Sequence, residues 1–184
     1  MNKRFVVAVV LSGFAMVTGA TAQHQPMKDC PMMAQTEQQK GMDHHDGMNA
    51  RGEQGMGFDQ LKTTHHFRLL ADGGAIEVGV NDVKDRVRRD EIRAHLGHIA
   101  RMFSEGNFSI PMFVHDQVPP GVETMKQHKS AIRYKYVETE LGGQVRISTS
   151  NAEALRAIHE FLRFQIQEHK TGDASEVTRH YSGR

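Results

Sequence analysis

The sequence contains no tryptophan, a single cysteine and almost no net charge. Because Cys30 has no partner cysteine in the chain, an intramolecular disulfide is excluded, and its thiol is a metal ligand, an intermolecular bridge or incidental. A formal charge of +1 gives no global electrostatic argument for nucleic acid or an anionic membrane as a partner. Beyond the N-terminus, no apolar run is long enough to span a bilayer. We therefore expect neither a nucleic-acid-binding nor a membrane-spanning protein.

The familiar catalytic motifs are also absent. The chain has no Gly-x-Ser-x-Gly, no Walker loop, no Gly-x-Gly-x-x-Gly and no His-Glu-x-x-His. Cys30 stands in a polar segment that is a poor place to hold a nucleophile against a base. Glu91, Glu153 and Glu160 fit the solvated faces of expected helices. These observations favour a binding protein over an enzyme.

The first 22 residues have the features of a signal peptide. Lys3 and Arg4 provide the positive start, and residues 5–17 form a short apolar run. Ala20-Thr21-Ala22 is a small-residue cleavage site. We expect an exported protein, periplasmic or secreted, whose mature chain begins near Gln23.

Residues 23–57 are rich in methionine, histidine, glutamine and glycine, and residues 27–48 contain no Val, Ile, Leu or aromatic side chain. Such a segment buries too little apolar surface to offset its ordering entropy, so we expect a disordered tail. Thioether and thiol sulfur suit Cu(I), and imidazole suits Cu(II). The alternative is a solvated linker in which the methionines have no role. On the metal hypothesis, a copper ion is bound by Met27, Cys30, Met32, Met33, Met42, His44, His45 and Met48.

Residues 58–173 read as one α+β domain built from two ββα repeats. Each half contains two alternating strands beside a Gly-Gly pair, then a helix, with apolar stripes at Ile92, Leu96, Ile99 and Phe103 and at Leu155, Ile158, Leu162 and Ile166. A four-stranded antiparallel sheet with both helices on one face buries both stripes. Residues 107–130 form a long connection in which 122–128 is a possible helical turn, and residues 174–184 are expected to be flexible.

The opposite face of the expected sheet is charged. It carries Arg68, Glu77, Arg133, Lys135 and Arg146. On an antiparallel sheet such a face is solvated or meets a partner, so an envelope protein is a second expected class of partner.

Histidines are a further unusual feature of the domain. His65 begins the first strand, and His95 and His98 lie one turn apart on the first helix, a spacing that lets two imidazoles reach one ion. The alternative is that His95 flanks the core with one hydrogen bond while His98 is solvated. A metal site within the domain would therefore use His65, His95 and His98 first.

Two resemblances accompany these patterns. Residues 30–33 (CPMM) and 42–48 (MDHHDGM) resemble the Met/His-rich segments of bacterial periplasmic copper-resistance proteins. Residues 56–60 (MGFDQ), 63–67 (TTHHF) and 161–166 (FLRFQI) are similar to a group of exported bacterial proteins without an assigned activity. The resemblances imply export and copper binding or buffering. The alternative function is an envelope structural or interaction module that binds another protein through its charged sheet face.

Overall fold

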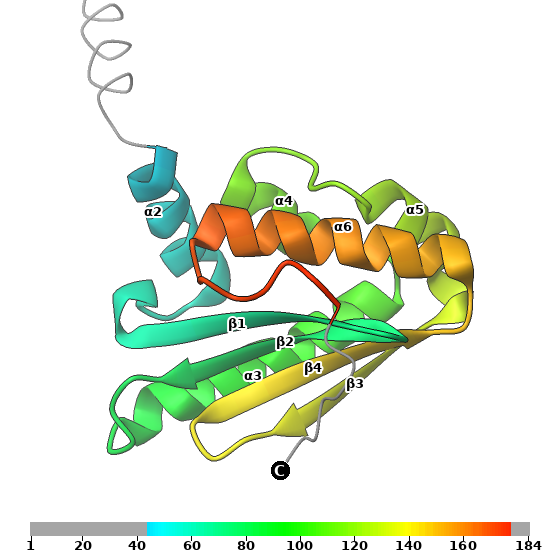
Figure 1. Ribbon diagram of the computed structural model, residues 1–184. Helices are drawn as coiled ribbons and strands as arrows, with labels where there is room; N and C mark the ends of the chain where they lie inside the picture. The colour runs from blue at the N-terminus through cyan, green and yellow to red at the C-terminus, as the bar shows by residue number, and fades with distance from the viewer. Residues whose placement is uncertain (1–43, 178–184) are drawn as a thin grey trace, which may run out of the picture. The chain divides into compact units, whose positions relative to one another are not determined.

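The computed structural model describes residues 44–177, with side chains from residue 47 onward (Figure 1). The expected signal peptide and the expected ligands Met27, Cys30, Met32, Met33 and Met42 lie outside this range, as do residues 178–184. The helices are α2 (His44–Met56), α3 (Arg86–Ser104), α4 (Ser109–His115), α5 (Val122–Gln127) and α6 (Ala152–His169), with 3-10 turns at Gln60–Lys62 and Lys129–Ala131. The strands are β1 (Thr63–Leu70), β2 (Gly73–Val80), β3 (Ile132–Glu138) and β4 (Gly142–Thr149).

The strands form a four-stranded antiparallel sheet in the order β1-β2-β4-β3, which confirms the α+β prediction. The two hairpins meet through their second strands, β2 and β4. Gly73-Gly74 and Gly142-Gly143 are each the first two residues of the second strand of a hairpin. The turns therefore lie just before the glycines, at residues 71–72 and 139–141. The two halves therefore repeat the same strand–strand–helix order.

Alternation along the strands separates the two faces of the sheet as the sequence predicts. Phe67 pairs with Ile76, and Tyr136 pairs with Val145, on the inner face. His66 pairs with Glu77, and Lys135 pairs with Arg146, on the outer face. The inner face packs against α3 and α6 in one continuous apolar core.

Each long helix covers the hairpin of the other repeat. α3 follows the first hairpin but packs mainly on β3 and β4, whereas α6 packs mainly on β1 and β2. His159 on α6 donates its Nε2 proton to the carbonyl oxygens of Leu70 and Gly73, at 2.9 and 3.0 Å. A side chain at Gly74 would collide with Leu162, so glycine allows α6 to approach β2 closely. The two repeats are thus interlocked.

Both long helices begin at side-chain caps. Asp85 accepts from the amide of Arg88, so α3 begins after Asp85. Asn151 caps α6 by accepting from Glu153 and Ala154 amides. The inner stripe of α6 includes the buried Ala154, Ala157 and Phe161, whereas Leu155 is only half-buried.

The connection between the repeats is folded. The predicted turn at 122–128 corresponds to α5, and α4 is an additional helix that the sequence pattern did not reveal. α4 is short and contains Pro111, which a helix tolerates in its first turn because the amides there lack intrahelical acceptors. It packs against α2.

The prediction that residues 23–57 form one disordered tail is wrong for residues 44–56, which form α2. Met48 is buried with 1% of its surface exposed, and Arg51 donates from Nε to the Val114 carbonyl at 2.9 Å. A Cβ at Gly52 would meet only the flexible ends of the Gln60 and Met56 side chains, so α2 lies close to the 3-10 turn that follows it. Methionine and arginine methylenes replace the missing Val, Leu and Ile as the apolar contact of this segment. The folded domain therefore begins before residue 58.

The outer edge of β1 is occupied by the segment after α6. Asp173 accepts hydrogen bonds from the Phe67 amide at 2.9 Å and from Nδ1 of His66 at 3.0 Å. Arg163 then holds the Ser175 carbonyl at 2.9 Å, so residues 174–177 follow the domain surface. Of the helices between residues 44 and 177, none has the length and apolarity needed to cross a membrane.

Candidate functional site: a histidine-lined cavity

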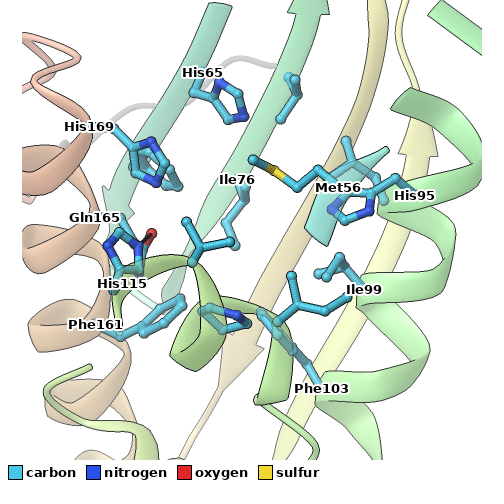
Figure 2. Close-up of a pocket in the computed structure, with 16 residues that line it drawn as sticks. Met56, His65, Ile76, His95, Ile99, Phe103, His115, Phe161, Gln165 and His169 are labelled. Atoms are coloured by element: carbon cyan, nitrogen blue, oxygen red, sulfur yellow. Dashed lines mark hydrogen bonds between the residues drawn. The ribbon is translucent and has the colours of Figure 1, made fainter. Parts of the chain in front are cut away.

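The inner face of the sheet carries a cavity of about 70 Å³ between α3 and α6 (Figure 2). Its floor is formed by β1 and β2, through Phe67, Ile76 and Val78, and α4 and Met56 of α2 close it. The walls are mainly apolar, with Leu96, Ile99, Phe103, Ile110, Val114 and Phe161 among them. A space of this size accommodates a metal ion with a small ligand, but not a large cofactor.

Four histidines reach this cavity, each from a different element. They are His65 of β1, His95 of α3, His115 of α4 and His169 of α6. His169 lies between two of the others, with ring centres 5.4 Å from His65 and 5.2 Å from His115. The Phe58 ring contacts both His65 and His95, at 6.5 and 5.6 Å between ring centres. The fold therefore gathers imidazoles that are far apart in the sequence.

His65 is the most unusual of these residues. Its Nε2 atom is buried and finds no hydrogen-bond partner among residues 44–177. Burial, with smaller effects of the neighbouring imidazoles of His95 and His66, lowers the pKa of His65 to about 4. An unsatisfied buried nitrogen costs about 1–3 kcal/mol, so a neutral imidazole is held here with its lone pair or proton uncompensated.

Of the predicted pair, His95 lines the cavity and His98 does not. Burial, with a smaller effect of His98, lowers the pKa of His95 to about 4, and its ring lines the cavity. His98 is exposed on α3 and does not line the cavity. The helical repeat places the position three residues on partly around the helix, which here turns it to solvent. The structure thus brings His65 and His95 to one cavity and leaves His98 outside it.

His115 is positioned by polar neighbours from α6. Its Nε2 lies 3.0 Å from Oε1 of Gln165, and its Nδ1 lies 3.8 Å from a carboxylate oxygen of Glu168. Both His115 and Gln165 are nearly fully buried. In metal-ligating histidines one ring nitrogen is held by a neighbouring group and the other binds the ion, whereas here Gln165 and Glu168 face both nitrogens and fix the orientation of the His115 ring.

The cavity is lined by side chains of the types that ligate metals, but these side chains do not surround a common point. Within residues 44–177 no three His, Cys, Asp or Glu side chains converge on a position for an ion. Metal–nitrogen bonds of about 2 Å place two imidazole centres on one ion about 5 Å apart, close to the spacings around His169. Ring orientation is what must change, since His65 and His169 are stacked at 14°. Rotating a side chain about 30° away from its rotamer costs about 0.5–1.5 kcal/mol.

Three of the predicted tail ligands lie in helix α2 and not in a disordered tail. His44 and His45 form the first residues of α2, with side chains outside the described part. Met48 is packed on the domain beside His65 and His169 and does not belong to a flexible segment. Sequence reasoning missed Met56, His115 and His169. Only His169 carried a signal, since it lies four residues after Gln165 and eight after Phe161 on one face of α6.

The metal-free protein is expected to lose stability in acid because of this cavity. In the folded state His65 and His95 have pKa values near 4, whereas unfolded histidine titrates near 6.5. The unfolded chain therefore binds more protons between these values, so stability is full above pH 6.5 and falls toward pH 4. A shift of this size corresponds to about 3 kcal/mol for one isolated group.

Urea unfolding in the presence of a chelator, from pH 7.5 to 4, measures this fall. His65→Leu should flatten it, and His98→Gln, at an exposed position, should leave most of it in place. A stability that is independent of pH in the wild type would contradict the buried neutral state of these two histidines.

Comparison with known proteins adds no assignment to this geometry. Neither a protein-family model, nor a curated protein, nor a solved structure matches the chain.

Proposed function

We propose that this protein is exported and binds or buffers copper, and that the histidine-lined cavity holds the ion. The observation that carries the proposal is that four histidines and the Met56 thioether line one small, mainly apolar cavity, where the buried Nε2 of His65 has no hydrogen-bond partner among the described residues. Imidazole together with thioether sulfur is a donor combination that suits copper. Binding an ion offsets the cost of the unsatisfied nitrogen.

The charge of the cavity favours Cu(I) over a divalent ion. Its imidazoles and its thioether are neutral donors, and the walls are apolar. An unpaired charge in such surroundings is costly, and the cost rises steeply with the charge. Glu168 lies beside His115 at 3.8 Å and supplies one carboxylate at the edge of the donor set. One carboxylate balances a monovalent ion.

The N-terminal segment fits the same function as a second copper-binding region. Met27, Cys30, Met32, Met33, Met42, His44 and His45 remain proposed ligands there, with sulfur for Cu(I) and imidazole for Cu(II). The signal-peptide pattern of residues 1–22 supports export to a compartment where copper is handled outside the cytoplasm.

Competition titration with a coloured Cu(I) chelator tests this function in the mature protein and in a variant that lacks residues 23–43. The deletion leaves α2 complete, so we expect it to retain one ion bound in the cavity and to lose the weaker binding by the tail. Loss of all copper binding would disprove the cavity site, and an unchanged stoichiometry would disprove binding by the tail. Mn(II), which prefers oxygen donors, serves as the negative control.

The second candidate function is interaction with an envelope protein through the outer sheet face. Arg133 and Lys135 on β3 are exposed there, and Arg68 and Arg146 lie on the same face with Glu77. Reversing charge with Arg133→Glu and Lys135→Glu should abolish recovery of a partner by cross-linking in the envelope while copper binding stays unchanged. Partner recovery that survives the reversal would count against this surface.

A further inference from the structure

His65 and His169 line two spaces at once. Besides the inner cavity, they form part of an outer pocket of about 230 Å³ on the side of the domain where α2 meets β1. Asn49, Gln60, Thr63, Thr64 and Thr171 give this outer pocket a polar lining. Leu61 on its rim is 80% exposed, so the pocket lies at the protein surface. The two imidazoles therefore stand between solvent and the inner cavity.

Helix α2 places one methionine in each of the two spaces. Met48 lines the outer pocket beside His65 and His169, and Met56 lines the inner cavity with His65 and His95. Eight residues of helix separate the two sulfur-bearing side chains, a rise of about 12 Å along the axis. Both methionines face the domain, since Met48 is 1% exposed and Met56 packs against the apolar core.

We infer that the outer pocket is a second, entry site for Cu(I), formed by Met48 with His65 and His169, from which the ion passes into the inner cavity. The inference rests on the proposed function and deepens it by assigning a route. The transfer involves ligand exchange alone: the ion leaves the Met48 thioether and gains the Met56 thioether and His95. His65 and His169 are common to both ligand sets. The oxidation state of the ion does not change.

The donors explain why the ion moves inward. A thioether with two imidazoles at a polar, solvent-facing pocket holds Cu(I) weakly enough to exchange, because water competes there. The inner cavity adds the imidazoles of His95 and His115, and its mainly apolar lining strengthens each electrostatic interaction between the ion and its ligands. In the sequence, α2 follows directly on the Met/His-rich segment, and Met48 stands in the first half of this helix.

Two methionine substitutions separate entry from storage in the full mature chain. Met48→Leu should slow loading of Cu(I) from a coloured chelator complex at least tenfold, as followed by stopped-flow absorbance, with the final affinity within threefold of the wild type. Met56→Leu should lower the affinity at least tenfold and leave the initial loading rate unchanged. Met102→Leu replaces a buried methionine of α3 outside both spaces and serves as the matched control.

A second measurement keeps the inference testable if Met48→Leu folds poorly. In a Met56→Leu/His95→Leu/His115→Leu variant, which removes every donor that only the inner cavity has, the ion should stop in the outer pocket, and the ¹³C-labelled methyl signal of Met48 should shift with one equivalent of Cu(I). A Met48→Leu protein that loads at the wild-type rate, or an unmoved Met48 methyl signal in the triple variant, would overturn the entry site while leaving the inner site intact. Absence of cavity-bound copper in the wild type would instead overturn the proposed function.

Discussion

Leu162→Ala is expected to lower the free energy of unfolding by about 2–5 kcal/mol, because it removes buried methyl groups from a site that cannot collapse. Leu162 is fully buried on α6 and its Cδ1 faces Gly74 of β2. Truncation thus opens a void between the helix and the hairpin that it covers. Urea unfolding monitored by circular dichroism measures the change. Leu96→Ala, at the corresponding place on α3 against Gly143, should have a cost in the same range.

Lys135→Ala is the matched surface control, since Lys135 is exposed on the outer face of β3 and its loss should change stability by less than about 0.5 kcal/mol. Arg146, on the same face, is a poorer control. Its guanidinium binds Asp72 and the carbonyl oxygens of Gly74 and Ile147, so Arg146→Ala also removes contacts that hold the turn between β1 and β2. Equal losses from Leu162→Ala and Lys135→Ala would contradict the assignment of the two sheet faces.

The second large effect is expected from the paired substitution His65→Leu/His169→Leu, which should weaken Cu(I) binding by the cavity at least a hundredfold. Both residues line the inner cavity and the outer pocket, so their loss leaves the outer pocket with Met48 as its one proposed ligand and removes two of the four imidazoles of the inner cavity. Leucine preserves the apolar contacts of His65 and His169 with Phe67. Chelator competition in the variant that lacks residues 23–43 isolates the cavity from the tail.

The control for this pair is His128→Gln/His159→Gln, at histidines that lie outside both spaces. His128 faces Glu153 at 3.2 Å, and His159 bonds to the turn after β1, so the substitution alters stability but not the donor set. An affinity unchanged in the His65/His169 variant would show that the cavity does not hold the ion. An equal loss in the control would indicate unfolding.

The sequence predicts the sheet and both long helices because regularly spaced apolar residues form their buried faces. Ile92, Leu96, Ile99 and Phe103 recur at helical intervals, and Phe67, Ile76 and Val145 alternate with polar residues along strands. Regular apolar spacing does not predict helix α2, because its inward side carries Met48 and glycines instead of branched apolar residues. Its helical state depends on contact with α4, which no local pattern encodes.

The site is harder to foresee than the fold. His65 and His95 could be suggested by proximity along predicted elements, but their convergence with His115 and His169 depends on the positions of four separate elements. The placement of His115 follows from α4, a seven-residue helix within the connection between the repeats. Exposure of His98 follows from the rotation of α3 about its own axis, which depends on packing against β3 and β4. Tertiary packing therefore decides which histidines meet.

Each long helix covers the hairpin of the other repeat, and this arrangement affects how the chain folds. Because α6 shields β1 and β2, the first repeat alone leaves the apolar face of its own hairpin open to water. Contacts between strands near residue 65 and a helix near residue 162 close a loop of almost the whole domain, and such distant contacts slow folding. A chain that emerges from its N-terminus onward thus has no complete core until its last helix appears. The order of emergence delays completion of the core until synthesis is nearly finished.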